Sequence, residues 1–95
     1  MDGIKEIAKH NGFKNSLSKA AEEAAEFIQV LMRYQISPSD ELKRDLLEEI
    51  ADTLITIEQV CLHMNFKKCD IDEWKEGKIN KTLNRIENET TRRTK

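Results

Sequence analysis

The pattern of apolar and polar residues along the chain is typical of α-helices. Between residues 16 and 34, apolar residues recur at a spacing of three or four, which places them on one broad stripe of a helix. The stripe consists of Leu17, Ala20, Ala21, Ala24, Phe27, Ile28 and Leu31. The alternation typical of strands is absent from the sequence, and only three Gly and one Pro interrupt it. The pattern predicts an all-α fold, an antiparallel helical bundle of about four helices.

Capping and breaking residues place the ends of these helices. The four are expected over about residues 2–10, 16–34, 38–65 and 70–88. The dipeptide Asn11-Gly12 is a typical helix end, and Ser37 followed by Pro38 is a typical helix start. The polar tail, residues 89–95, is expected to fray. A single domain is expected over residues 1–95, with its core at about 13–88.

The third helix is unusually apolar around its circumference. Its apolar residues cover roughly 220° of the helical wheel, against the ~100° stripe of a helix buried on one side. This helix is therefore expected to be buried on two sides. A chain of 95 residues is small enough that its own core is marginal, so a homo-oligomer is expected to cover the second side.

Composition and charge exclude several classes of protein. The chain has 36% charged and 38% hydrophobic residues, which favours a globular protein without a transmembrane segment. Its formal net charge is −2, so no basic surface predicts binding to nucleic acid or to a membrane. Cys61 and Cys69 fit neither a disulfide framework nor a zinc site. With no secretory signal in its first residues, the protein is expected to be cytoplasmic.

Two acidic motifs carry the candidate chemistry. In the second helix Glu23 and Glu26 are three residues apart, as are Glu49 and Asp52 in the third, so each pair projects from one helix face. The connection between the two helices is short, which makes them antiparallel neighbours. At a rise of ~1.5 Å per residue, both pairs lie within roughly 3 Å of the same height. Four carboxylates are therefore predicted to converge across one helical hairpin.

Such a cluster is chemically suited to a hard divalent cation. Adjacent carboxylates repel one another unless a cation neutralises them, and several oxygen ligands suit Mg²⁺, Mn²⁺ or Ca²⁺ better than zinc. Because Mg²⁺ commonly bridges carboxylates and phosphates, phosphate chemistry is the resulting hypothesis. The alternative is that both pairs belong to ordinary solvated helix faces, since acidic pairs are common in a chain so rich in charge.

The two motifs resemble those of a known enzyme family. EEAAE is followed after 22 residues by EIAD, and this resembles the EExxE and ExxD motifs of the MazG-like nucleotide pyrophosphohydrolases. These enzymes belong to the all-α NTP pyrophosphatase superfamily. The resemblance covers about residues 13–86 and includes the Lys-containing approach to the first motif, SLSKAAEEAAEFIQVL.

The resemblance implies an activity, a cofactor and a set of site residues. The implied reaction is the Mg²⁺-dependent hydrolysis of a nucleoside triphosphate between its α and β phosphates, with Mn²⁺ as a possible substitute. The implied metal ligands are Glu23, Glu26, Glu49 and Asp52. By the same resemblance Glu22 is a candidate for orienting or deprotonating the attacking water, and Lys19 occupies the basic approach position. A solvated surface role for Glu22 is the alternative.

The fourth helix adds candidates for binding the phosphates. The stretch from Lys78 to Arg85 resembles one in which a Lys and a later Arg of the family reach the phosphates, although Thr82 stands where many relatives carry Asn. An ordinary solvated basic face is the alternative for Lys78 and Arg85. The family typically forms dimers or tetramers whose helices complete one another's sites, which implies a MazG-like bundle completed by oligomerisation.

Two other functions remain open from the sequence. The chain could be a relative within the same superfamily that is specialised for dUTP, dCTP or phosphoribosyl-ATP. It could instead be a non-catalytic helical oligomer, a module that binds a protein partner through its acidic face. His63 carries no recognisable site pattern and is expected to be a surface histidine.

Overall fold

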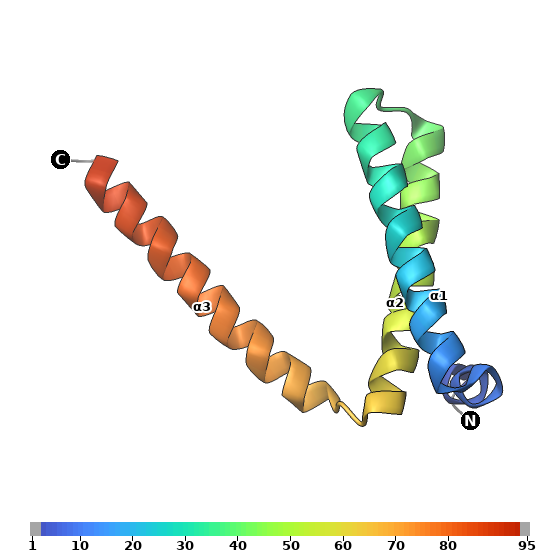
Figure 1. Ribbon diagram of the computed structural model, residues 1–95. Helices are drawn as coiled ribbons and strands as arrows, with labels where there is room; N and C mark the ends of the chain where they lie inside the picture. Colours follow the sequence, from blue (N-terminus) through green and yellow to red (C-terminus); the bar gives the residue numbers. More distant parts are fainter. Residues whose placement is uncertain (1–2, 94–95) are drawn as a thin grey trace. The chain divides into compact units, whose positions relative to one another are not determined.

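The computed structural model describes residues 3–93, which form three α-helices (Figure 1). These are α1 (Gly3–Ile36), α2 (Asp40–Met64) and α3 (Lys68–Arg93), and no strand occurs in the described part of the chain. The prediction of an all-α fold is confirmed. The chain divides into two units, Met1–Asn65 and Phe66–Lys95, so α1 and α2 belong to one unit and α3 to the other. The single domain predicted over residues 1–95 stays a prediction.

The first unit is a helical hairpin in which α1 and α2 pack side by side (Figure 1). At the turn, the backbone N–H of Ser37 donates to the carbonyl of Arg33 at 3.0 Å. The cap of α2 is Ser39, whose hydroxyl accepts from the backbone N–H of Leu42 at 3.0 Å. From the sequence pattern, this cap was expected at Ser37. Ser39 has extended backbone angles, so a helix cannot run through it from Pro38.

A kink at Gly12 divides α1. Gly12 has φ 79° and ψ 169°, a backbone region that is essentially confined to glycine. The segment before it turns away from the axis of the rest of α1 (Figure 1). The predicted break at Asn11-Gly12 therefore occurs where expected. The label α1 covers the helical segments on both sides of this break, so three helices are labelled where about four were predicted.

Buried polar contacts hold the segment before the kink against α2. The Nε2 atom of His63 lies 3.0 Å from the carbonyl oxygen of Ala8 and 3.0 Å from the hydroxyl of Ser16. Since a carbonyl can only accept, Nε2 carries a hydrogen and donates it to Ala8. The side-chain amide of Asn11 donates to Gln59 Oε1 at 3.1 Å. The expectation that His63 is a surface residue is wrong, because these contacts leave it half-buried.

The interface between α1 and α2, here called the hairpin seam, follows a spacing of alternating three and four residues. Such spacing is typical of two helices packed at a shallow angle. Its buried and half-buried members are Ser16, Ala20, Glu23, Phe27, Val30 and Tyr34 in α1, and Leu42, Leu46, Glu49, Thr53, Thr56, Val60 and His63 in α2. The seam is apolar near the turn and becomes largely polar from Glu23 and Glu49 onward.

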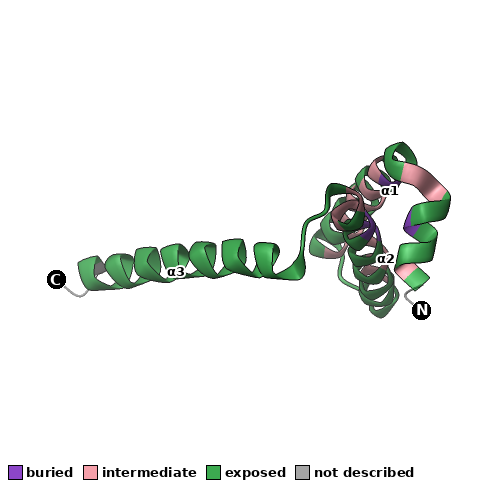
Figure 2. Ribbon diagram, turned by 90° about the horizontal axis from the view of Figure 1, so that it is seen from below, coloured by how far each residue is buried: buried purple, intermediate pink, exposed green. Residues whose placement is uncertain are grey.

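Few large apolar side chains are buried in the described chain (Figure 2). The buried hydrophobic residue is Ala8, whereas Ile36, Leu47 and Leu54 are 80%, 70% and 56% exposed. The expected two-sided burial of the third helix is met on one side only within this chain: α1 covers part of α2, and the rest of its apolar surface faces outward. None of the described helices combines the length and hydrophobicity needed to cross a bilayer.

The second unit contains α3, which is longer than the sequence pattern suggests. The backbone N–H of Lys67 donates to Asp70 Oδ2 at 2.9 Å. Asp70 therefore lies inside the first turn and reaches back to the residue before the helix, as in a capping box. The helix was expected to start near Asp70 and to end near Asn88, and it continues to Arg93. Residues 94–95 of the predicted tail lie outside the described residues.

We expect the substitution Gly12→Ala to destabilise the hairpin by about 1–3 kcal/mol, because an alanine at this φ and ψ is strained. Nothing lies within 4 Å of a Cβ built at Gly12, so the cost comes from the backbone rather than from a clash. Unfolding in urea, followed by circular dichroism, measures the change.

Gly77→Ala is the matched control. Gly77 lies within α3, and nothing lies within 4 Å of a Cβ built there. Alanine at this position should therefore stabilise the helix by up to ~1 kcal/mol. If both substitutions stabilise the protein, the strain assigned to Gly12 is contradicted.

Candidate metal centre

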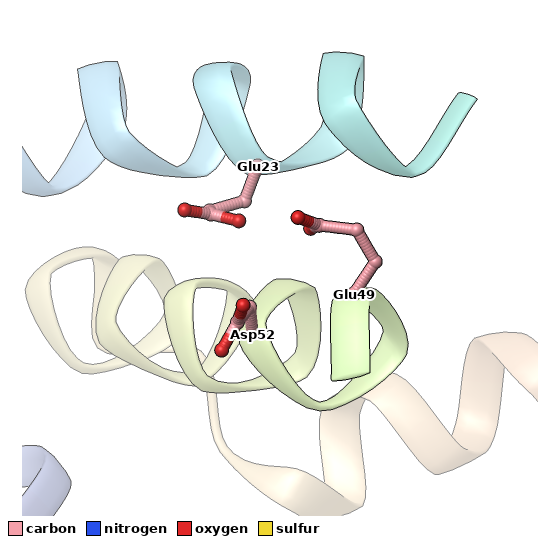
Figure 3. A group of neighbouring side chains, drawn as sticks. All are labelled: Glu23, Glu49 and Asp52. Carbon is pink, nitrogen blue, oxygen red and sulfur yellow. The ribbon is translucent and has the colours of Figure 1, made fainter. Parts of the chain in front are cut away.

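Three carboxylates from the two helices of the hairpin converge. Glu23 comes from α1 and Glu49 and Asp52 from α2, and the side chains approach one another across the gap between the helices (Figure 3). One oxygen from each lies within 4.8 Å of the others. Glu23 and Glu49 are half-buried, and Asp52 is the most exposed of the three. Three of the four carboxylates predicted to meet at one height are therefore gathered in this group, which we call the acidic cluster.

The register of the hairpin seam produces this meeting. The Thr53 hydroxyl donates to the backbone carbonyl of Glu23 at 3.3 Å, which places Glu23 opposite the turn of α2 that carries Asp52. Glu49 is one helical turn earlier on the same side of α2. The two acidic motifs thus meet because the helices are antiparallel and the turn between them is short.

Two oxygen atoms of the cluster are enclosed and have no partner. Glu23 Oε2 and Glu49 Oε2 are both buried and accept no hydrogen bond from the described residues. An enclosed carboxylate oxygen without a donor is costly, roughly 1–3 kcal/mol or more for a charged group. Both oxygens face this cost at the point where the two carboxylates also repel each other. A bound cation would remove both penalties.

Glu49 shows the electrostatic effect of this arrangement. Its pKa is raised from 4.5 to about 7, first because burial disfavours the charged carboxylate, and then through hydrogen bonding with and repulsion from Glu23 and Glu26. The side chain as a whole is half-buried, but its inner oxygen is closed off from solvent. Near neutral pH the cluster therefore retains a proton or takes up a cation.

No basic side chain neutralises the cluster in the part of the chain that the structure describes. The ion pair that forms among the described residues joins Arg85 to Glu89 within α3, at 3.9 Å, and does not involve the cluster. The donors available at the cluster are carboxylate oxygens alone, which is the ligand set that Mg²⁺ and Mn²⁺ prefer. The residues present therefore fit such an ion.

The other predicted residues of the hairpin lie at different distances from this centre. Glu26 is exposed and is not among the three converging groups, although its carboxylate acts on Glu49. Lys19 and Glu22 are exposed and line a cavity of about 370 Å³ together with Glu23 and Asp52. The structure thus brings a lysine and a further carboxylate to the open side of the cluster.

Lys78 and Arg85 lie in the other unit, on α3. Both are exposed, and the Nζ atom of Lys78 is 5.9 Å from the centre of the Trp74 ring. Arg85 makes the ion pair with Glu89. Their predicted role in binding phosphate stays a prediction.

A run of polar residues, not predicted from the sequence, continues from the acidic motif along α2. Thr56 and Gln59 are buried, and His63 is half-buried. Together with Glu49 and Asp52 they repeat at intervals of three and four, the same spacing as an apolar seam. A search for polar residues at that spacing would have found them.

Comparison of the chain with protein-family models, with curated proteins and with solved structures found no match. The resemblance to the MazG-like enzymes therefore depends on the two acidic motifs and on the residues around them.

The raised pKa of Glu49 predicts how stability changes with pH when no metal is present. A carboxyl group whose pKa is higher in the folded protein stabilises it below the unfolded pKa, and that contribution is lost as the pH rises through the folded pKa. The free energy of unfolding of the hairpin should therefore fall as the pH rises from about 4.5 through about 7. Urea unfolding at several pH values in EDTA measures this loss.

Glu49→Gln should flatten this pH dependence. Glu48→Gln is the matched control, because Glu48 is the neighbouring residue in the same helix and is exposed. An unchanged pH profile in Glu49→Gln would contradict the role assigned to this carboxyl group.

Proposed function

We propose that this protein is a Mg²⁺-dependent nucleoside triphosphate pyrophosphohydrolase. It would cleave a (d)NTP between the α and β phosphates and release a (d)NMP and pyrophosphate. The observation that carries the proposal is the acidic cluster, Glu23, Glu49 and Asp52, with two enclosed carboxylate oxygens that have no partner. The resemblance of its two motifs to the MazG-like enzymes supports the same reaction.

Within this proposal each residue has a chemical task. Glu23, Glu49 and Asp52, with Glu26 beside them, would hold the ion. A bound Mg²⁺ or Mn²⁺ would neutralise part of the polyphosphate charge and increase the acidity of a nearby water. The oxygen of that water attacks the α-phosphorus, and the bridging oxygen departs with pyrophosphate. Glu22 lines the same cavity as Glu23 and Asp52, where its carboxylate would accept the proton of the water.

Cations of the chain would assist at the phosphates. Lys19 lines the cavity beside the acidic cluster, where its ammonium group would offset phosphate charge. Lys78 and Arg85 would contribute further positive charge from α3.

A homo-oligomer, a dimer or a tetramer, is the second part of the proposal. Leu47, Leu54 and Trp74 are 70%, 56% and 72% exposed, and α2 and α3 both carry many such side chains. Leaving this much apolar surface in water is unfavourable by ~25 cal/mol per Å². Association of MazG-like bundles through these faces would cover this apolar surface. The proposed enzyme would be cytoplasmic and act on free nucleotides.

The same exposed faces favour one alternative function, a non-catalytic helical module that binds a protein partner. In that case the acidic cluster would serve recognition only. A superfamily relative specialised for dUTP, dCTP or phosphoribosyl-ATP is a narrower form of the enzyme proposal.

Activity tests the enzyme proposal directly. Incubation with a panel of NTPs and dNTPs in Mg²⁺, followed by ion-exchange separation, should yield monophosphate and pyrophosphate. Asp52→Asn and Glu26→Gln should each reduce turnover by roughly 100-fold or more, because even residues behind metal ligands are commonly worth ~10–100-fold.

Glu48→Gln is the matched control and should keep full turnover. Mg²⁺ should also raise the melting temperature of the parent protein but not that of Asp52→Asn, since a ligand stabilises only the fold that binds it. Diphosphate plus phosphate as products would identify a different hydrolase. If the protein turns over no nucleotide and its melting temperature changes with neither Mg²⁺ nor Mn²⁺, the non-catalytic module is favoured.

Sedimentation equilibrium tests the oligomer. We expect a mass of two or four times the 11.1 kDa of one chain. Leu47→Lys places a charge in the exposed apolar face of α2 and should shift the protein toward the monomer, whereas Arg44→Ala, at an exposed charged position of the same helix, should not. A monomeric parent protein at micromolar concentration would contradict this part of the proposal.

A further inference from the structure

The cavity beside the acidic cluster extends well beyond the carboxylates. At one end it is lined by Glu22, Glu23 and Asp52, and farther along α2 and α1 it is lined by Gln59 and Asn11. Its volume of about 370 Å³ falls within the ~300–1,000 Å³ typical of small-molecule sites. From Asp52 to Gln59 the helix rises ~10 Å. This distance is comparable to that between the α-phosphate of a nucleotide and the outer edge of its base.

At the far end of the cavity, the side-chain amides of Asn11 and Gln59 are hydrogen-bonded to each other. Asn11 donates to Gln59 Oε1 at 3.1 Å, and Gln59 is 3% exposed, so the bond fixes the planes of both amides. The pair leaves donor hydrogens on the NH₂ group of Gln59 and acceptor capacity on the carbonyl oxygen of Asn11. Neither makes a hydrogen bond within the described residues.

The residues that line the cavity near this pair are chemically different from the carboxylates of the acidic cluster. Ile7 and Ile55 line the cavity and supply apolar surface against which a flat ring can pack. Thr56 also lines it, but its hydroxyl hydrogen is donated to the carbonyl of Thr53 at 2.8 Å. Free donors and acceptors for recognition are thus concentrated on the two amides.

We propose that this cavity holds the nucleoside half of the substrate and that Asn11 and Gln59 read the hydrogen-bonding edge of its base. A fixed donor beside a fixed acceptor complements a nucleobase edge, on which an acceptor and a donor also lie side by side. A phosphate, whose oxygens only accept, does not present that pair, and ribose 5-phosphate is the control for binding through the hydroxyls of the sugar. This inference rests on the proposed function, because it assigns the selectivity of the same site.

Binding to the unaltered protein gives the first test and needs neither metal nor turnover. The full-length chain is labelled with ¹⁵N, and AMP, GMP, CMP, UMP or ribose 5-phosphate is added in EDTA. The side-chain NH₂ signals of Asn11 and Gln59 should shift and saturate with at least one monophosphate and stay in place with ribose 5-phosphate. The signals of Asn15 and Gln29, which are exposed and do not line the cavity, serve as controls. No shift at Asn11 and Gln59, or equal shifts with ribose 5-phosphate, overturns the inference.

Turnover gives the second test. Across the NTP panel, the ratio of kcat/KM between the best and the worst base should fall at least tenfold in Gln59→Met and in Asn11→Leu, with KM changing more than kcat. Gln29→Met, an exposed glutamine of α1, should leave the ratio unchanged.

The two proposals fail in different ways. The inference that Asn11 and Gln59 recognise the base is overturned if the parent protein hydrolyses NTPs with no base preference, or if its preference survives both substitutions. The enzyme proposal stays intact in either case. Binding at Asn11 and Gln59 without hydrolysis of any nucleotide overturns the enzyme proposal instead. If a variant fails to fold, the titration of the unaltered protein decides.

Discussion

The polar half of the hairpin seam is the constraint on which the rest of the site depends. Two long helices usually associate through apolar side chains, yet from Glu23 and Glu49 onward this seam contains carboxylates, hydroxyls and a histidine. Such contacts are directional, so they determine register more strictly than apolar packing does. They also contribute little hydrophobic stabilisation. The hairpin therefore gains a defined geometry at its centre and relies on other surfaces for stability.

Because the acidic cluster lies within this seam, binding of the proposed cation would change the stability of the hairpin. The repulsion that raises the pKa of Glu49 acts between the same two helices that the seam holds together. Without a cation, a proton on Glu49 relieves that repulsion at the cost of one charged ligand. The proposed cation would relieve it with all three carboxylates ionised, so folding and metal binding would favour each other. For this reason the metal would contribute to folding as well as to chemistry.

Much of this arrangement is predictable from the sequence, and the features that are not predictable have physical reasons. The meeting of Glu23, Glu49 and Asp52 requires only the helical rise and a short antiparallel turn, both of which the residue pattern indicates. The roles of Gln59 and His63 were missed because apolar periodicity does not detect a seam built from polar groups. The cap was placed at Ser37 instead of Ser39 because both serines fit the pattern and only the backbone angles distinguish them. Glu26 shares a face with Glu23 in sequence terms, but it is exposed and acts on Glu49 from outside the converging group.

The turn at residues 37–39 has a consequence for how the chain can vary in evolution. One residue inserted in α1 between Glu23 and Ile36, or in α2 between Asp40 and Glu49, would rotate a motif by ~100° and carry its carboxylate out of the seam. A residue inserted in the turn lengthens the connection without rotating either helix. Length changes should therefore accumulate at 37–39 in related chains, while the intervals from each motif to its end of the turn stay fixed.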